Sequence, residues 1–308
     1  MQHPAIKIKG LSKSYGDVKA LNKIDITINE GDFFGILGPN GAGKTTIINI
    51  ITGLVFRDNG STLVFGKDTV KDFRFTRSKI GLAAQELSVD WFFSIEKLLF
   101  FQAGYYGIKP ENAKNSIDEL LKRLGLYKKR NSRLRQLSGG MKRRFQLAKA
   151  LVHDPDIIIL DEPTAGVDVE LRRDLWKYLK SLHKNGKTIL LTTHYIEEAE
   201  SLCEKVSIIN KGKVLKEGSP KKLIETLGKS AVIIELDSIP KSLIKTIKDL
   251  KAIIDKNTLT FQIKESNTTL PKIIHRLSSE GARIKSITPN NSSLEEVFLN
   301  LTGEKMND

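Results

Sequence analysis

Two neighbouring segments constrain the fold of this chain more than any other feature of the sequence. Residues 137–144 read LSGGMKRR, and residues 154–168 read DPDIIILDEPTAGVD. The SGG turn opens a predicted helix, where free N–H groups and the positive end of the helix dipole favour an anion. The later run predicts a buried strand that ends at Asp161 and Glu162, at the sheet edge where α/β proteins bind ligands. Together the two segments predict a nucleotide-binding α/β fold.

A second anion-binding segment lies upstream. Residues 38–45, GPNGAGKT, fit the phosphate-loop pattern G-x-x-x-x-G-K-[ST] and follow a short apolar run. Glycines let successive N–H groups turn towards phosphates, Lys44 can reach the β- and γ-phosphates of ATP, and the Thr45 hydroxyl can bind Mg²⁺. A helix is expected after the loop although residues 45–52 are rich in β-branched side chains, because the motif outweighs local propensity. The expected phosphate contacts are Gly38, Pro39, Asn40, Gly41, Ala42, Gly43, Lys44, Thr45 and Thr46.

Composition sets the frame for these motifs. The 308 residues are 40% hydrophobic and 28% charged, which is ordinary for a globular protein, and the single cysteine excludes a disulfide framework. The N-terminus lacks the apolar core of a signal peptide, and no apolar stretch approaches the length of a membrane-spanning helix. The net charge of +14 suits a membrane surface, nucleic acid or nucleotide, but the lysines are scattered, so charge favours the cytoplasmic leaflet only weakly.

The pattern of elements predicts two domains. Residues 5–32 alternate as short antiparallel strands, 86–136 read mainly as helix, and 137–227 alternate helix and strand as in a parallel sheet. Beyond this point the order becomes strand, helix, strand, strand, helix, strand, which is that of a ferredoxin-like unit. We therefore expect domains at 1–228 and 229–308, divided at Gly228-Lys229-Ser230.

Six motifs in order resemble those of an ATP-binding subunit of an ABC transporter. They are Tyr15, the phosphate loop, Gln85, LSGGMKRR, IIILDEP and Thr193-His194, and the resemblance covers residues 5 to about 227. The GMKRR run, LLTTHYIEEAE and the closing SLEEVFLNLTGE are similar to ATPases of bacterial ABC-2 type exporters of drugs, polysaccharides or lipids. The resemblance implies a P-loop ABC ATPase domain, with a parallel sheet core, an antiparallel β subdomain and a helical subdomain, followed by a small α+β ferredoxin-like domain.

The resemblance also implies roles around the γ-phosphate. Asp161 would hold Mg²⁺ through water, and Glu162 would be the general base, a role typically worth about 10²–10⁴ in rate. Gln85 would bind Mg²⁺ and sense the γ-phosphate; many relatives have proline before it, where this chain has Ala84. His194 would contact the γ-phosphate and help place the water. Taken alone, Asp161-Glu162 could cap a helix, and a lone Gln or His is more often structural.

Other roles belong to adenine and to a partner chain. Tyr15 would stack on adenine, which is worth about 1–3 kcal/mol for base–aromatic stacking; its alternative role is to cover the core. Ser138, Gly139 and Gly140 would bind the γ-phosphate of ATP held by an opposite subunit, and Asp168 would cross the same interface. The resemblance thus implies a dimer of this chain that closes around two ATP molecules and Mg²⁺ and parts after hydrolysis.

A transporter ATPase without a spanning helix needs a separate partner. Seven aromatic residues lie close together, and in the family this region receives a cytoplasmic helix of the membrane subunit; their alternative role is to form the core of a helical subdomain. The seven are Trp91, Phe92, Phe93, Phe100, Phe101, Tyr105 and Tyr106. We therefore expect a separately encoded multi-spanning permease, a second copy of this chain, no nucleic acid, and a peripheral location on the cytoplasmic face of the inner membrane.

Two other function classes stay open. A soluble ABC ATPase acting on ribosomes would be expected to carry two such domains with a charged linker, and an ABC protein of DNA repair or chromosomes would need a long coiled coil or zinc modules between the phosphate loop and LSGG. The sequence shows neither arrangement. The cargo is chosen by the membrane subunit, and export rather than import depends on the resemblance of the LSGGMKRR helix and the tail to ABC-2 ATPases.

Overall fold

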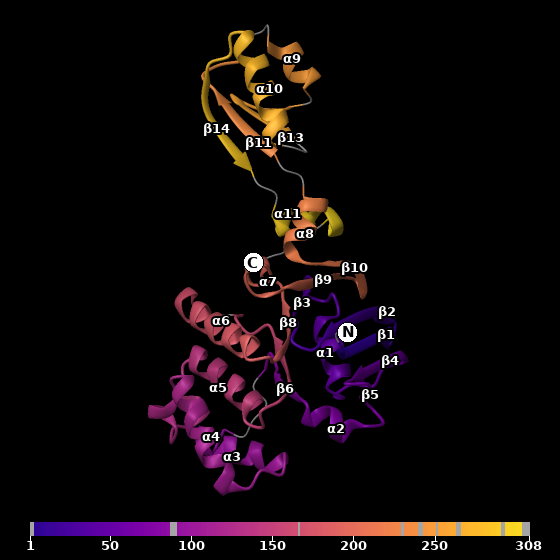
Figure 1. The fold of residues 1–308 in the computed structure, drawn as a ribbon, viewed down its shortest axis with the longest axis vertical. Helices are drawn as coiled ribbons and strands as arrows, with labels where there is room; N and C mark the ends of the chain where they lie inside the picture. Colours follow the sequence, from indigo (N-terminus) through magenta and orange to yellow (C-terminus); the bar gives the residue numbers. More distant parts are fainter. Residues whose placement is uncertain are drawn as a thin grey trace. The chain divides into compact units, whose positions relative to one another are not determined.

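The protein is described here as a computed structural model that covers residues 3–86, 91–165, 167–228, 231–239, 243–250, 252–262, 266–290 and 293–303. The chain forms two compact units, one ending at Pro220 and one beginning at Lys221 (Figure 1). Helix α8 (Pro220–Leu227) is therefore grouped with the second unit, whereas the sequence placed it at the end of the first. Lys229 and Ser230, the predicted boundary, lie outside the described residues.

A six-stranded sheet forms the centre of the first unit. Its strand order is β10-β9-β3-β8-β7-β6, parallel except for the edge strand β10. The central strands are buried along their whole length, as the continuous apolar runs in the sequence predict for a sheet covered on both faces. The strands are β3 (Phe33–Leu37), β6 (Ile80–Ala83), β7 (Ile157–Asp161), β8 (Thr188–Thr193), β9 (Lys205–Asn210) and β10 (Lys213–Gly218).

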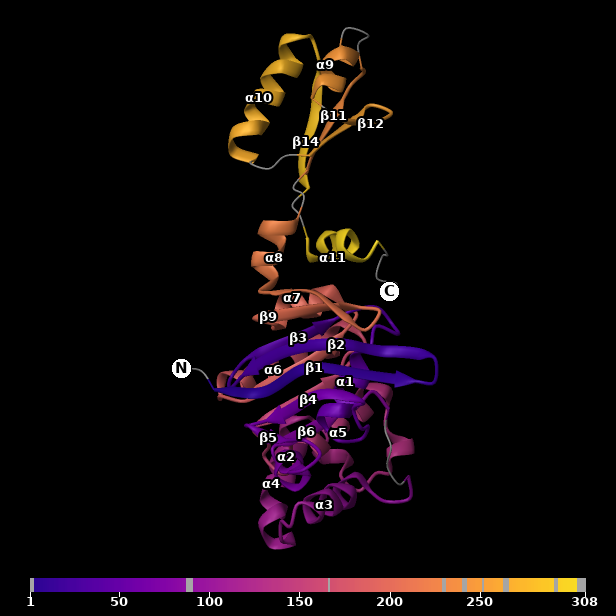
Figure 2. The same ribbon diagram turned by 90° about the vertical axis from the view of Figure 1, so that its right-hand side faces the viewer.

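An antiparallel sheet covers one side of this centre (Figures 1 and 2). Its strand order is β2-β1-β4-β5, and β1 pairs with both neighbours in the antiparallel sense, as predicted for residues 5–32. Along much of β1 and β2, buried and exposed residues alternate, so one face of this sheet points towards the core. Helix α1 (Lys44–Ile51) shares one apolar core with this sheet and the central strands. The strands are β1 (Pro4–Tyr15), β2 (Val18–Asn29), β4 (Asn59–Val64) and β5 (Lys67–Asp68).

The remaining helices of the first unit lie mainly on the other side of the six-stranded sheet (Figure 1). Most have clear start signals: Ser94, Ser138 and Asp168 each accept a hydrogen bond at the N-cap of α3, α5 and α6, and Pro110 opens α4. The helices are α2 (Phe73–Ser78), α3 (Ile95–Tyr105), α4 (Pro110–Arg123), α5 (Gly139–Leu151), α6 (Val169–Lys184) and α7 (Ile196–Leu202), with short 3₁₀ turns at Tyr127–Lys129 and Leu134–Gln136. No helix within the described ranges is both long and apolar enough to cross a bilayer.

The second unit has the ferredoxin-like order and topology. Its strand order, β12-β13-β11-β14, is antiparallel throughout and places β13 between the two strands that flank α9. Apolar residues of α9 and α10 pack on the same face of the sheet, against alternate residues of β11 and β13. The elements are α8, β11 (Ala231–Leu236), α9 (Leu243–Asp249), β12 (Ile253–Asp255), β13 (Thr258–Gln262), α10 (Ser266–Ser279), β14 (Ile284–Asn290) and α11 (Leu294–Thr302). The predicted fold class is confirmed.

Candidate nucleotide site

The phosphate loop joins β3 to α1 and leaves a cradle of backbone atoms. Gly43, the residue before α1, has φ +105°, a conformation that favours glycine. A Cβ at Gly43 would lie 2.7 Å from Leu21 Cδ2, and one at Gly38 would lie 2.5 Å from the Ile209 carbonyl oxygen. The helix that the motif predicts, although residues 45–52 are rich in β-branched side chains, begins at Lys44. The glycines therefore allow both the turn and the close packing of neighbouring strands against it.

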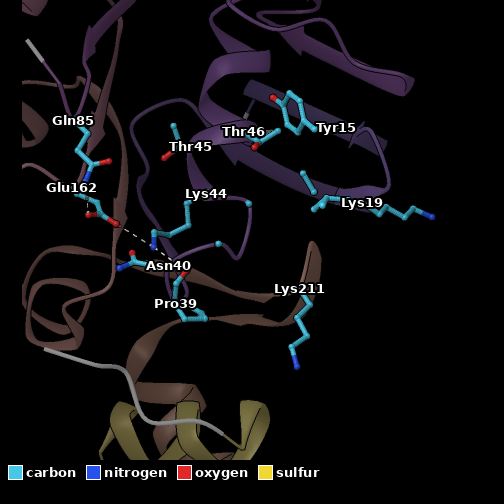
Figure 3. A pocket seen from close by; sticks show the side chains of 14 residues that line it. Tyr15, Lys19, Pro39, Asn40, Lys44, Thr45, Thr46, Gln85, Glu162 and Lys211 are labelled. Carbon is cyan, nitrogen blue, oxygen red and sulfur yellow. Dashed lines mark hydrogen bonds and ion pairs between the residues drawn. The ribbon is translucent and has the colours of Figure 1, made fainter.

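A pocket of about 570 Å³ opens beside this loop (Figure 3). Ten of the predicted residues line it: Tyr15, Pro39, Asn40, Gly41, Gly43, Lys44, Thr45, Thr46, Gln85 and Glu162. The sequence missed four further lining residues: Val18, Lys19 and Ala20 at the start of β2, and Lys211 in the β9–β10 turn. The volume lies in the range of small-molecule sites. With its backbone cradle and three lysines, the pocket fits ATP.

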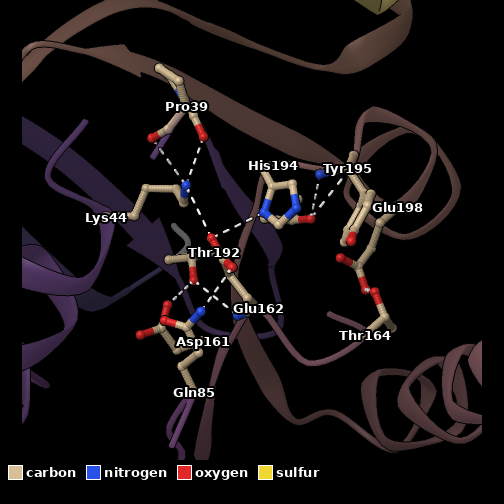
Figure 4. A network of polar contacts seen from close by, with 12 residues as sticks. Pro39, Lys44, Gln85, Asp161, Glu162, Thr164, Thr192, His194, Tyr195 and Glu198 are labelled. Atoms are coloured by element: carbon tan, nitrogen blue, oxygen red, sulfur yellow. Dashed lines mark hydrogen bonds and ion pairs between the residues drawn. The ribbon is translucent and has the colours of Figure 1, made fainter. Parts of the chain in front are cut away.

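Four side chains, which we call the catalytic cluster, converge beside the phosphate loop: Lys44, Gln85, Glu162 and His194 (Figure 4), of which the first three line the pocket. Lys44 Nζ lies 3.2 Å from Glu162 Oε1 and donates to the carbonyl oxygens of Gly38 (2.7 Å) and Pro39 (3.2 Å). His194 Nδ1 lies 3.2 Å from the same Oε1 atom, and Gln85 Nε2 donates to Glu162 Oε2 at 3.3 Å. Glu162 is therefore the centre on which the other three converge.

The electrostatics of Glu162 follow from this arrangement. Burial alone would raise the pKa of this carboxyl, but Lys44 and His194 outweigh burial and hold the pKa below its usual value. The group is thus an anion at neutral pH, although the Glu162 residue is only 6% exposed. A buried carboxylate beside a phosphate-loop lysine has the charge and place for proton transfer.

The backbone of Glu162 is unusual as well. Its φ of 49° is left-handed, a conformation that costs a non-glycine residue roughly 1–2 kcal/mol. The Glu162 N–H donates to the Thr192 carbonyl oxygen at 3.0 Å, and its own carbonyl accepts from Arg143 Nη2 at 2.8 Å. These contacts hold a turn that points the side chain towards Lys44 rather than along the strand.

The predicted Mg²⁺ ligands lie at the ends of two strands and at the start of α1. Asp161, at the end of β7, is 2% exposed and accepts a hydrogen bond from the Thr192 hydroxyl, while Gln85 and Thr45 line the pocket. Among the described residues, no three His, Cys, Asp or Glu side chains group as a metal site. That donor set fits Mg²⁺ held largely by nucleotide phosphates with one or two protein oxygens, and does not fit a site built from protein ligands alone.

The first four residues of the LSGGMKRR run, which we call the signature segment (residues 137–140), lie apart from this pocket. Ser138 and Gly139 are exposed at the start of α5, where the Ser138 hydroxyl accepts from the Met141 N–H at 3.3 Å. Asp168 is exposed at the start of α6 and accepts from the Leu171 N–H at 2.9 Å. A Cβ at Gly140 would come within 1.9 Å of Leu171 Cδ2, so this glycine also lets α6 approach α5. None of these four residues lines the phosphate pocket of the same chain.

The aromatic residues between 91 and 106 divide into two groups. Trp91, Phe92, Phe101 and Tyr105 are exposed, and Phe101 packs edge-to-face on Phe93 with ring centres 5.1 Å apart. Tyr106 stacks on His153 at the far end of α5, with ring centres 3.6 Å apart. Part of the cluster thus packs within the unit, as a helical core would require, and the rest remains on the surface.

Sequence comparison places these features in a family. Residues 21–165 match the family model of the ABC transporter, and residues 218–302 match that of the C-terminal domain of DrrA1-3-like ATP-binding proteins. The Nod factor export ATP-binding protein I of Rhizobium sp. (strain N33) is 37% identical over 306 residues, 99% of each chain. The protein of the same name from Sinorhizobium fredii is 37% identical over 304 residues, 99% of this chain and 88% of its own.

The chain belongs to the ATP-binding proteins of ABC transporters. It is an ATPase that couples the hydrolysis of ATP to transport. Solved structures agree: the dimeric bacterial ABC transporter cassette MJ0796 superposes with a TM-score of 0.65 and 30% identity, covering 70% of this chain and 98% of that one. The cbiO1 protein of Clostridium perfringens, part of the transporter complex cbiONQ, gives 0.66 and 26% over 90% of this chain and 100% of its own.

Proposed function

We propose that this ABC ATPase is the nucleotide-binding subunit of an ABC-2 type exporter, working as a dimer on a separately encoded multi-spanning permease at the cytoplasmic face of the inner membrane. Relatives that match over almost the whole chain carry names of export ATP-binding proteins, and the second unit matches a C-terminal domain of DrrA1-3-like proteins. A ribosome- or DNA-acting ATPase is not favoured, because the whole-chain relatives are export proteins.

The hydrolytic mechanism that we propose centres on Glu162. The loop N–H groups and Lys44 bind the ATP phosphates, and the Glu162 carboxylate takes the proton from the water that attacks the γ-phosphate. His194, 3.2 Å from Glu162, orients the carboxylate and the water. Mg²⁺, when bound, neutralises phosphate charge, and Thr45, Gln85 and Asp161 are the residues that would hold it.

Lys44 gives this mechanism a dependence on substrate. Without nucleotide its ammonium group pairs with Glu162, which depresses the pKa of the carboxyl. ATP phosphates would draw Lys44 away, and the pKa of Glu162 would then rise towards its usual value. A base strengthens as its pKa rises, so the arrival of substrate would activate its own general base.

The signature segment completes the site from a second copy. Ser138 and Gly139 are exposed at the start of α5 and lie outside the pocket of their own chain, which supports contact with ATP bound by the opposite subunit. Two ATP molecules would then join two chains, and hydrolysis would release them. Asp168, at the exposed start of α6, would lie at the same interface.

Co-purification from the native cell tests the exporter assignment. The tagged chain would be solubilised from membranes in mild detergent and its companions identified by mass spectrometry. We expect a stoichiometric multi-spanning protein, whose gene would then show which cargo depends on it. Recovery only from the soluble fraction, with ribosomes or DNA-associated proteins, would overturn the exporter assignment and leave the ATPase activity in place.

A further inference from the structure

Arg143, in the signature helix α5, reaches the back of the catalytic cluster of its own chain. Its Nη2 atom donates to the Glu162 carbonyl oxygen at 2.8 Å, and Nη1 donates to the Gln85 carbonyl oxygen at 2.9 Å. Nη1 also lies within hydrogen-bonding distance of the Ala84 carbonyl oxygen (3.3 Å) and of Gln146 Oε1 (2.8 Å). One guanidinium group thus joins the segments that follow two neighbouring strands, β6 and β7.

Two of the carbonyls that Arg143 binds belong to Gln85 and Glu162, whose side chains must point in a defined direction for the proposed hydrolysis. Gln85 and Glu162 meet through their side chains at 3.3 Å (Figure 4), and both project into the pocket. Glu162 holds a left-handed backbone, which persists only where its surroundings fix it. Gln85 follows β6 rather than lying within it, so no strand pairing fixes its backbone. Each residue therefore needs an outside contact to fix its direction, and Arg143 supplies one to both.

The environment of Arg143 suits a fixed cation. Burial lowers the pKa of the guanidinium, while the negative charges of Asp161, Glu162 and Glu198 act in the opposite direction. The planar fork presents several N–H donors in a rigid array, so it can serve divergent carbonyls at once. A lysine ammonium at the same place keeps the charge but is a single point on a flexible stem.

We propose that Arg143 is a positioning residue for hydrolysis: by holding the carbonyls of Gln85 and Glu162, it aims the two side chains at the γ-phosphate position. The proposal rests on the general-base role proposed for Glu162. It concerns the chemical step and not nucleotide binding, because Arg143 does not line the pocket. Misplacement of a reacting group by about 1 Å can cost on the order of 10²-fold in rate.

Arg144 is a matched control on the same helix. Its Nη1 atom donates to the Leu124 carbonyl oxygen at 3.1 Å, on the α4 side of α5 and away from the nucleotide pocket. Arg143→Lys and Arg144→Lys make the same chemical change at adjacent positions. Only the first removes a fork that bridges Gln85 and Glu162.

Steady-state ATPase kinetics of the full chain test the proposal. For Arg143→Lys we expect kcat to fall about 10- to 100-fold, in the range of losses when an outer support is removed, with KM for ATP and the melting temperature near those of the parent. Arg144→Lys should keep the parental kcat. Equal kcat values for Arg143→Lys and the parent would overturn the proposal, as would a loss of kcat that merely follows a fall in melting temperature.

Two further measurements distinguish a failure of the Arg143 proposal from a failure of the general-base role proposed for Glu162. Hydrogen–deuterium exchange without nucleotide should rise in peptides that contain residues 84–86 in Arg143→Lys but not in Arg144→Lys, and unchanged exchange would contradict the positioning role. Glu162→Gln, assayed beside them, tests the general base itself. If Glu162→Gln turns over normally, the proposed chemistry fails; if it is inactive while Arg143→Lys matches the parent, only the inference fails.

Discussion

The catalytic cluster and the signature segment lie in one compact unit, but their side chains are engaged very differently. In the cluster, Glu162 is buried and contacts Lys44, Gln85 and His194, and its backbone is held from behind by Arg143. In the signature segment, Ser138 is exposed, and its hydroxyl accepts from the Met141 N–H at the start of its own helix. The side chains proposed to act in hydrolysis are thus preassembled within one chain, whereas the signature segment leaves its helix start exposed, where the proposed function places the ATP of a second chain.

The difference also separates two kinds of energetic cost. Preorganised groups need little rearrangement at the moment of reaction, so their loss reduces the rate directly. An exposed helix start gains its binding energy only when an anion and a partner arrive, so its loss weakens assembly and leaves the single-chain site intact. Substitutions in the two regions should therefore have different kinetic signatures.

The largest effect is expected in the cluster. Glu162→Gln removes the base without changing the size of the side chain, and turnover should fall by about 10²–10⁴-fold. ATP binding should persist, because Lys44 and the loop remain, and an ATP-dependent dimer should accumulate on a sizing column. Unchanged turnover would contradict the general-base role, and loss of ATP binding would show that the carboxylate serves the phosphate loop instead.

The next effect tests the signature segment. Ser138→Arg places a long side chain where the opposite ATP would lie, and we expect the ATPase rate of the assembled protein to fall about 10- to 100-fold. The affinity of the dilute monomer for a fluorescent ATP analogue should remain within about twofold of the parent. Ser181→Arg, which adds the same charge at an exposed position of α6, is the control. A large loss of monomer affinity would instead place the signature segment in the site of its own chain.

A smaller effect is expected at the mouth of the pocket. Tyr15 is 48% exposed, and Lys13 Nζ lies 5.5 Å from its ring centre, so one ring face is partly covered and the other can stack on adenine. Tyr15→Ala should weaken ATP binding by about 1 kcal/mol, or roughly fivefold, at the low end of base–aromatic stacking. Tyr15→Phe should restore affinity, since the ring carries the interaction. Equal affinities for the alanine variant and the parent would show that Tyr15 only covers the core.

The sequence predicted the fold well because its signals were local or periodic. Apolar runs gave the central strands, and the phosphate-loop motif outweighed the β-branched residues after it, as the helix starting at Lys44 confirms. The second unit also followed the predicted order of elements. Helix α8 is grouped with the second unit although the sequence placed it before the boundary, because eight residues of amphipathic helix carry no local mark of the unit to which they belong.

The site was predicted less completely, for a physical reason. Arg143 looked like one of several basic residues of a signature helix, and its role depends on carbonyls that lie far from it in sequence. Lys19, at the start of β2, and Lys211, in the β9–β10 turn, meet at the pocket only because of the sheet topology. The left-handed backbone of Glu162 has no signal in its own sequence at all. The roles of the individual site residues remain predictions that the variants above test.

The smallest effect concerns a buried carboxyl outside the cluster. Glu198 on α7 is fully buried and accepts a hydrogen bond from the Thr164 hydroxyl at 3.1 Å (Figure 4). It accepts another from the Trp176 indole N–H at 3.3 Å. Burial raises the pKa of Glu198, and these donors oppose the shift only in part. The folded chain therefore binds the proton more tightly than the unfolded chain, so this group stabilises most below its unfolded pKa and loses that contribution as pH rises through the folded pKa.

Glu198→Gln imitates the protonated carboxyl at every pH. At pH 8 we expect its melting temperature, without nucleotide, to exceed that of the parent by about 2–4 °C, equivalent to about 1 kcal/mol, and the gain to shrink towards pH 5. Glu197→Gln, on the exposed side of the same helix, should change the melting temperature neither at pH 8 nor at pH 5. A Glu198→Gln variant that is less stable at pH 8 would mean that the carboxylate charge is needed there, most directly by Arg172, whose charge lowers the pKa of Glu198. In that case the preassembled region would extend from the catalytic cluster through α7, and the contrast with the open signature segment would be sharper still.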